Sequence, residues 1–312
     1  MQLWKKLLLN AYRQADMPRR WCSNRAAAAA GMAPVMVLFY HRVADHQPTP
    51  WTISTTMFAR QMRWLKNRYD MLSLDEAQRR LRSRVNRRPA VCITFDDGYA
   101  DNCDRAIPLL LRERIPCTYF VCNHHIETGD RFPHDAAAGY DFAPNTIQQL
   151  RNMAAAGIEI GAHTRNHVDV AAIDDERVLH DEIVTAGEDL ERAISSPVRY
   201  FACPFGMPEN LSNRAFDVAR EAGYRGVCSA YGAYNFPLDD PFHLRRIHGD
   251  PQMARLKNWA TIDPRKMVER SGFEYSAGAT AGLSSSETLF DDGTAGQASS
   301  GTPAVAALQE EE

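Results

Sequence analysis

The sequence has no long apolar run. No window approaches the roughly 18 consecutive apolar residues that a membrane-spanning helix requires. Near the N-terminus, the apolar run Leu7-Leu8-Leu9 stops after three residues, whereas the apolar region of a secretory signal peptide has about 7–15 residues. We therefore expect no membrane span and a cytoplasmic or membrane-peripheral location, and the cell envelope stays open as an alternative.

Cysteine pairs with the spacing of a zinc ribbon are also absent. The chain has seven cysteines, an odd number, so at least one is unpaired within a monomer. Five of them lie in or beside apolar, strand-like runs: Cys92, Cys117, Cys122, Cys203 and Cys228. This pattern predicts small core residues of a reduced protein.

The C-terminal end of the chain lacks basic residues, and the N-terminal end has almost no acidic ones. Residues 271–312 contain seven acids, no Lys or Arg, and mostly Gly, Ala, Ser and Thr, which predicts a disordered acidic tail. Residues 1–33 carry six basic residues and only one acid. They predict a basic, weakly helical N-terminal extension, for which contact with an anionic membrane face and a wrongly assigned start codon are the alternatives. The body has no basic–aromatic interleaving, so no nucleic-acid partner is expected.

Between these ends, residues 34–270 predict one parallel α/β domain. Strands are expected at 35–39, 90–94, 117–121, 158–161, 200–202, 226–229 and 244–247, and helices at 55–69, 101–114, 146–156, 174–194 and 212–222. Alternation of the two kinds of element favours a parallel sheet. Seven strand–helix units suit a barrel. An open doubly wound sheet is the alternative, but the glycine-rich phosphate loop that is typical after its first strand is absent here.

Two adjacent carboxylates, Asp96 and Asp97, end the second predicted strand before Gly98. Neighbouring carboxylates repel each other unless a cation or a proton lies between them, and a simple turn needs only one. Other predicted strand ends carry His41, the His163–His167 segment and His248. Chemistry in a (β/α) barrel gathers at the carboxyl ends of the strands, so a functional site is favoured over a turn.

His163 and His167 are four residues apart, a spacing that would aim both rings the same way on one helical turn, as a divalent metal requires. The residues between them exclude the HExxH pattern of zincins. A third ligand and a base must therefore come from elsewhere. The Asp96–Asp97 pair could supply both.

Together these motifs resemble the polysaccharide deacetylase family, or NodB-homology domain, over residues 34–262. The resemblance rests on 39–42 (FYHR), 94–98 (TFDDG), 163–167 (HTRNH), 201–206 (FACPFG) and 244–248 (LRRIH). It implies a distorted (β/α)7 barrel acting on an N-acetylated glycan or polysaccharide. It also implies that a divalent metal, usually zinc, is bound by Asp97, His163 and His167, and that Asp96 is the general base.

The same resemblance implies an oxyanion hole that uses the backbone amide near Phe205. Pro204 and Tyr99 are further candidates for oxyanion or substrate contact. Trp51, Tyr231 and Tyr234 could stack on sugar rings, whereas His124, His125 and His134 are expected in a polar loop at the rim.

The chain also departs from the family's pattern. Ala202 stands where the family commonly has an arginine that braces the catalytic Asp, and Arg246 is the candidate substitute. Arg245 is expected to face away, because neighbouring strand residues point to opposite sides. The general acid is expected to be His248, with His41 as the competitor.

Three functions remain open at this stage. The leading hypothesis is a metal-dependent hydrolase that removes N-acetyl groups from a glycan. The alternatives are a non-catalytic glycan-binding module with a degenerate site, favoured by the missing arginine, and an amidohydrolase that acts on a small substrate.

Overall fold

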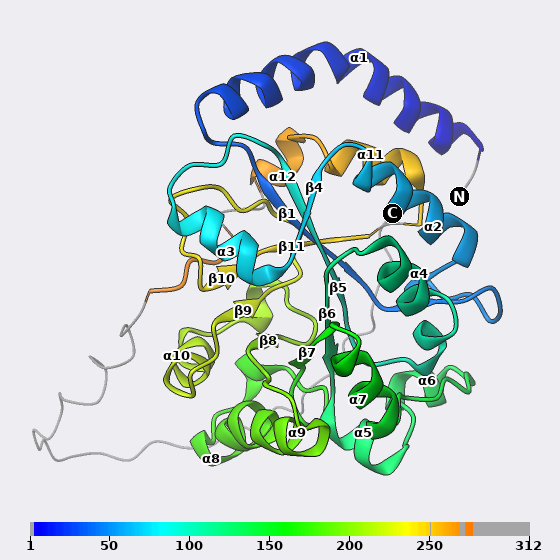
Figure 1. Ribbon diagram of the computed structural model, residues 1–312, viewed down its shortest axis with the longest axis vertical. Coiled ribbons are helices and arrows are strands. Elements are labelled where there is room, and N and C mark those ends of the chain that lie inside the picture. Colours follow the sequence, from blue (N-terminus) through cyan, green and yellow to red (C-terminus); the bar gives the residue numbers. More distant parts are fainter. Residues whose placement is uncertain (1–2, 250, 269–271, 277–312) are drawn as a thin grey trace, which may run out of the picture. The chain divides into compact units, whose positions relative to one another are not determined.

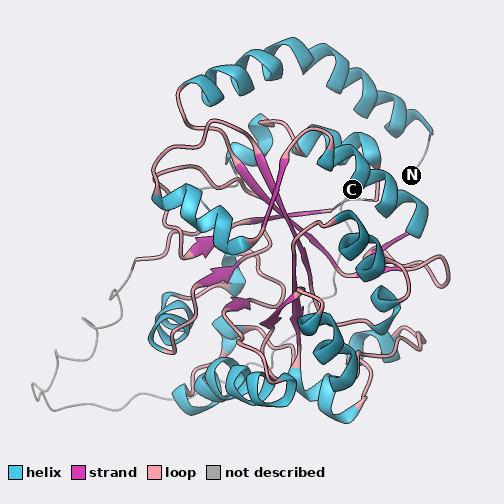
Figure 2. Cartoon of the chain, in the orientation of Figure 1, coloured by secondary structure: helices cyan, strands magenta, loops and turns pink. Residues whose placement is uncertain are grey.

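Parallel strands at the centre of the protein form one curved sheet surrounded by helices (Figure 2). The computed structural model describes residues 3–249, 251–268 and 272–276. The sheet order is β10-β9-β8-β7-β6-β5-β1-β11, with β4 paired to β5 at the side. The strand bounds are β1 Val35–Tyr40, β4 Asp70–Leu72, β5 Ala90–Phe95, β6 Cys117–Val121, β7 Glu159–Ala162, β8 Tyr200–Ala202, β9 Gly226–Cys228, β10 His243–Leu244 and β11 Arg246–His248.

Residues 243–248 join the two ends of this sheet. Only Arg245 separates β10 from β11; β10 pairs with β9, and β11 pairs with β1. Residues 243–248 therefore act as one interrupted strand that bonds to both ends and nearly closes the sheet into a barrel. This confirms the predicted distorted (β/α)7 barrel. A separate pair, β2 (Arg42–Val43) and β3 (Thr52–Ile53), lies outside it.

The strands predicted from continuous apolar runs are buried along their whole length. Every residue of β1, β5 and β6 is buried, as expected for strands covered on both faces. Helices cover the outside of the sheet (Figure 1). Their bounds are α1 Leu3–Ala29, α2 Thr55–Lys66, α3 Leu74–Arg82, α4 Ala106–Glu113, α5 Asn123–Thr128, α6 Pro133–Ala137, α7 Ile147–Ala155, α8 Glu176–His180, α9 Ala186–Ile194, α10 Asn213–Glu221, α11 Met253–Trp259 and α12 Pro264–Val268.

Polar residues cap several helices where the sequence placed them. The Ser54, Thr146 and Ser212 side chains accept hydrogen bonds from the first turns of α2, α7 and α10. Each bond satisfies one backbone N–H group that the helix itself leaves unpaired. These three helix starts are therefore confirmed.

Other helix predictions need correction. The helix expected over 101–114 is a 3-10 turn, Ala100–Cys103, followed by α4, and Pro108 lies in the first turn of α4, where a missing N–H causes no kink. The helix expected over 174–194 is interrupted by a π turn at Asp181–Thr185. The polar loop expected after β6 is partly helical, because it contains α5 and α6.

The N-terminal extension forms α1, which packs against α11 (Figure 1). Buried Arg20 anchors it by donating to the Asn258 carbonyl and by pairing with Asp16 and Asp263. No helix in the described ranges is long and apolar enough to cross a bilayer. This finding does not test contact with a membrane face, which stays a prediction.

The described part of the predicted tail, residues 272–276, lies against α10. Phe273 and Tyr275 pack on Phe216, with ring centroids 5.2 and 5.1 Å away, and the Tyr275 hydroxyl donates to Asp217. Residues 271 and 277–312, where most of the disordered tail was predicted, lie outside the described residues.

Candidate active site

The candidate residues converge at one edge of the barrel because they follow the carboxyl ends of parallel strands. His41 follows β1, the two aspartates follow β5, and His163 follows β7. Phe205 follows β8, and His248 ends β11. This edge is where a (β/α) barrel builds its site.

Asp97, His163 and His167 form a three-residue cluster. Asp97 Oδ1 lies 3.5 Å from His163 Nε2 and 3.3 Å from His167 Nε2. One candidate ligand atom from each residue lies within 4.8 Å of the others, and this is the one such cluster among the residues that the structure describes. The arrangement brings together the three residues that the sequence predicted as ligands.

The chemistry of this cluster fits a divalent cation. His163 Nδ1 lies 2.7 Å from the Ala202 carbonyl and must donate to it, so Nε2 carries the lone pair that faces Asp97. Asp97 Oδ1 is buried without a hydrogen-bond partner. A buried carboxylate beside an imidazole lone pair needs a cation.

The two histidines converge through a loop and not through a helical turn, so that part of the sequence argument was wrong. Residues 163–167 contain no helix, and Thr164 and His167 have φ angles of 60° and 55°. Asp97 also has a positive φ of 72°. Such conformations cost about 1–3 kcal/mol each in non-glycine residues and persist where surrounding contacts impose them, often at active sites.

Asp96 has a different partner from Asp97. Arg246 Nη1 donates to Asp96 Oδ1 at 2.6 Å, and both side chains are buried. Arg246 also donates to the Ser229 carbonyl and the Thr94 hydroxyl, which fix its guanidinium. Burial alone would raise the pKa of Asp96, but Arg246, with help from His163 and His41, holds that pKa below its usual value.

The neighbouring Arg245 takes the other side of the strand, as the alternation predicted. Its side chain donates to the Tyr231 hydroxyl and pairs with Asp239. The arginine beside Asp96 therefore comes from β11 and not from the strand on which Ala202 lies.

His41 and His248 lie together beside this pair, with ring centroids 6.2 Å apart. Trp51 contacts both rings at 4.7 and 5.3 Å. Burial lowers the pKa of His41, and burial together with His41 lowers the pKa of His248 to about 3. Both rings are therefore neutral near pH 7 in the free protein. Which of the two is the general acid stays a prediction.

Phe205 lies at the opposite side of the cluster, with its ring 5.2 Å from His167. Its φ is 60°, and the Gly206 N–H donates to the Pro204 carbonyl in a tight turn. Within the described residues no acceptor takes the Phe205 N–H. That group is available to an oxyanion, which stays a prediction of the sequence.

Tyr99 lies two residues after Asp97, and its side chain is buried. Its buried hydroxyl donates to Asp135 Oδ2 at 2.8 Å. Together with Trp51, Tyr140 and Phe142, it lines a cavity of about 150 Å³. Substrate contact by Tyr99 would therefore go through its ring.

Two aromatic predictions were wrong. Tyr231 and Tyr234 are buried, and the Tyr234 hydroxyl donates to backbone carbonyls, so neither ring is open to a sugar. Trp51 is 53% exposed and remains the candidate. Among the three rim histidines, His125 is buried against the Asp130 carbonyl. The sequence pattern does not distinguish exposed Trp51 from the buried aromatic residues Tyr231 and Tyr234, or buried His125 from the other two histidines.

Comparison with known proteins agrees with this geometry. Residues 83–227 match the family model described as polysaccharide deacetylase. The match spans just under half of the chain, which is similar to the polysaccharide deacetylase family over these residues. The chain is 24% identical over 239 residues to YxkH of Bacillus subtilis (strain 168), named as a candidate polysaccharide deacetylase, covering 75% of this chain and 78% of YxkH.

Two further relatives extend the comparison. A chitooligosaccharide deacetylase of Bradyrhizobium sp. (strain ANU 289) is 30% identical over 43% of this chain and 50% of its own length. The structure of the Streptococcus pyogenes deacetylase PplD superposes with a TM-score of 0.62 at 21% identity, covering 72% of this chain and 97% of PplD. The solved structure supports the fold, and the two relatives are what this chain is similar to in sequence.

Proposed function

We propose that this protein is a polysaccharide deacetylase that removes N-acetyl groups from an N-acetylated glycan and that it requires a divalent metal. The observation that supports the proposal is the division of labour between two adjacent carboxylates. Asp97 faces His163 and His167, whereas Asp96 is held by Arg246. Metal-assisted amide hydrolysis uses a cation site and a separate base, and the two aspartates have partners that suit these two roles.

Asp97, His163 and His167 would hold the metal. We assign zinc, because a ligand set of two imidazoles and one carboxylate is typical of catalytic zinc sites with an open position. When bound, the ion would polarise the amide carbonyl and make a neighbouring water easier to deprotonate. Which metal the site binds is part of this proposal, and metal analysis of the purified protein tests it.

The remaining steps belong to the chain's own side chains. Asp96, ionised at neutral pH, accepts the proton of the attacking water, and Arg246 fixes the direction of its carboxylate. The Phe205 N–H donates to the oxygen that gains negative charge. The proton that Asp96 has taken from the water then has to reach the leaving amine nitrogen, and His248 or His41, neutral in the free protein, would accept it and pass it on.

Aromatic side chains beside this machinery suit a sugar. Trp51 is exposed and touches both histidines, and half-buried Tyr140 lines the adjoining cavity. Aromatic faces pack against the apolar faces of pyranose rings. This supports a glycan substrate, and the bound unit would extend from the histidines toward that cavity.

The contact between Arg246 and Asp96 also removes the argument for a non-catalytic module. That alternative rested on Ala202, which stands where the family commonly has an arginine. A guanidinium reaches the same aspartate from β11 instead. No observation in the described residues favours a site without turnover.

Acetate release from a panel of N-acetylated oligosaccharides tests the proposal, with wild type compared with Asp96→Asn. The variant should lose activity by about 10²–10⁴-fold, the usual contribution of a general base, and keep its bound metal. Asp104→Asn, an exposed aspartate after the same strand, is the matched control and should be unaffected. Full activity in Asp96→Asn would refute the assignment of the base.

A further inference from the structure

Glu182 holds the loop that carries the two histidines. Its side chain is buried, and its carboxylate accepts three hydrogen bonds from that loop. The Arg165 and Asn166 backbone N–H groups donate to Oε2 at 2.9 and 3.0 Å, and the Asn166 side-chain amide donates to Oε1 at 2.6 Å. All three donors lie between His163 and His167 in sequence.

The loop needs such a partner because its conformation is strained. Thr164 and His167, on either side of the gripped residues, both have positive φ angles. Two consecutive N–H groups point to one side, and leaving either one buried and unpaired would cost about 1–3 kcal/mol. The Arg165 side chain adds ion pairs to Asp181 and Asp189. One stretch of helix thus binds the loop on this side, and the His124 N–H, which donates to the Arg165 carbonyl at 3.0 Å, binds it on the other.

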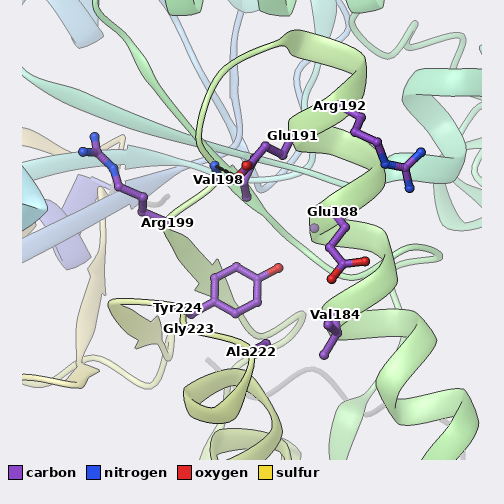
Figure 3. A pocket seen from close by; sticks show the side chains of 10 residues that line it. Val184, Glu188, Glu191, Arg192, Val198, Arg199, Ala222, Gly223 and Tyr224 are labelled. Carbon is purple, nitrogen blue, oxygen red and sulfur yellow. Dashed lines mark hydrogen bonds between the residues drawn. The ribbon is translucent and has the colours of Figure 1, made fainter.

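That stretch contains the π turn, Asp181–Thr185, between α8 and α9. The Tyr224 hydroxyl donates to the Ile183 carbonyl at 2.8 Å inside this turn. Tyr224 lines a surface cavity of about 480 Å³, and Figure 3 shows its hydroxyl directed toward the helix that carries Val184 and Glu188. Gly187 leaves room for the hydroxyl, since a Cβ there would overlap it. π turns are rare and occur frequently near functional sites.

We propose that Glu182 is a positioning residue for the metal ligands and that the π turn exists to present it. The inference rests on the proposed metal site. Glu182 touches neither the candidate ligands' rings nor a substrate in the described contacts. It acts through the backbone between His163 and His167, and so sets where the two imidazoles meet Asp97.

The test compares the Zn²⁺ affinity of purified variants by competition with a chromophoric chelator. Glu182→Ala should bind Zn²⁺ about 10–100-fold more weakly, the usual effect of removing a group that orients metal ligands. Glu182→Gln should stay near wild type, because its amide oxygen can accept both backbone bonds while Asn166 turns its own amide. Glu188→Gln, an exposed glutamate on the same helical stretch, is the matched control and should match wild type.

Several outcomes would overturn the inference. Wild-type affinity in Glu182→Ala would show that the loop holds the histidines unaided. Equal losses in Glu182→Gln and Glu182→Ala would show that charge, and not geometry, matters. Wild-type protein that binds no Zn²⁺ would refute the proposed metal site itself, which separates that failure from the failure of this inference.

A second variant keeps the test sound if Glu182→Ala does not fold. Tyr224→Phe removes only the hydroxyl that bonds to the π turn and should weaken Zn²⁺ binding several-fold. Unchanged affinity in Tyr224→Phe would refute the role of the turn, and with an unfolded Glu182→Ala it would refute the proposal.

Discussion

Replacing Arg246 by Met should destabilise the metal-free protein strongly, because it leaves the Asp96 carboxylate buried without its cation. Arg246 and Asp96 have 0% and 4% of their side-chain surfaces exposed. Removing one partner of such a pair typically costs about 3–5 kcal/mol. For a domain whose total stability is on the order of 5–15 kcal/mol, the loss is easily measured by urea unfolding.

The Arg246→Met change also removes the bonds to Ser229 and Thr94, so a double-mutant cycle isolates the pair. Asp96→Asn alone leaves a buried guanidinium without its anion and should destabilise as well. The double variant should then be more stable than the sum of the two losses predicts, with an interaction energy of about 2–3 kcal/mol. The measurement is made with a chelator present so that metal binding does not contribute.

An interaction energy below about 0.5 kcal/mol would refute this reasoning, because it would mean that the two charges are independent. The Arg246 side chain would then matter through packing alone, against Phe39 and Phe120, whose rings lie 5.0 and 5.4 Å from its guanidinium. The proposal that Arg246 replaces the family's arginine would fall with it.

Three other changes have outcomes that follow from single contacts. His248 has a folded pKa of about 3, which is lowered by burial, by His41 and by cations on α11 and α12, and raised by Asp96. As the pH falls through 6.5 the unfolded chain takes up a proton at this residue and the folded chain does not. The folded state should therefore lose about 2 kcal/mol of stability between pH 7 and pH 5. Urea unfolding at both pH values should show a smaller pH effect in His248→Asn. Trp51→Ala should raise KM for oligosaccharides several-fold with Zn²⁺ affinity unchanged, and an unaltered KM would exclude sugar stacking. Gly161→Ala should cost about 1–3 kcal/mol, because the added methyl overlaps the Phe120 ring, and an unchanged melting temperature would contradict that.

Much of the fold could be predicted because the relevant forces are local in sequence. The runs at 35–40, 90–95 and 117–121 are apolar apart from Thr94 and Thr118 and are buried along their whole length, which identifies them as strands covered on both faces. Arg246 could be assigned from alternation, since Arg245 and Arg246 are neighbours on one interrupted strand. The side-chain period of a strand needs no knowledge of tertiary contacts.

Most of the rest depended on contacts between distant residues. β4 was missed, since its three residues make sense only beside β5. α3 was missed although Ser73 caps it and Leu74, Ala77 and Leu81 lie on one helical face, which is a local signal. Thr164 and His167 have positive φ angles on either side of the residues that Glu182 binds, and the orientation of His163 depends on the Ala202 carbonyl. A backbone carbonyl leaves no mark in the sequence, and a single glutamate inside a helical pattern looks like any solvent-facing acid.

The backbone at Asp97 explains how two adjacent carboxylates avoid repelling each other. Asp96 leaves the end of β5 toward Arg246, whereas the left-handed conformation of Asp97 turns the next side chain toward His163 and His167. Each carboxylate therefore has its own positive partner: a guanidinium for Asp96 and, in the proposed enzyme, a metal ion for Asp97. Without the ion, Asp97 keeps a buried oxygen with no hydrogen-bond donor. The energetic need for a cation is thus greatest at Asp97, which is why we assign the metal to it and the proton transfer to Asp96.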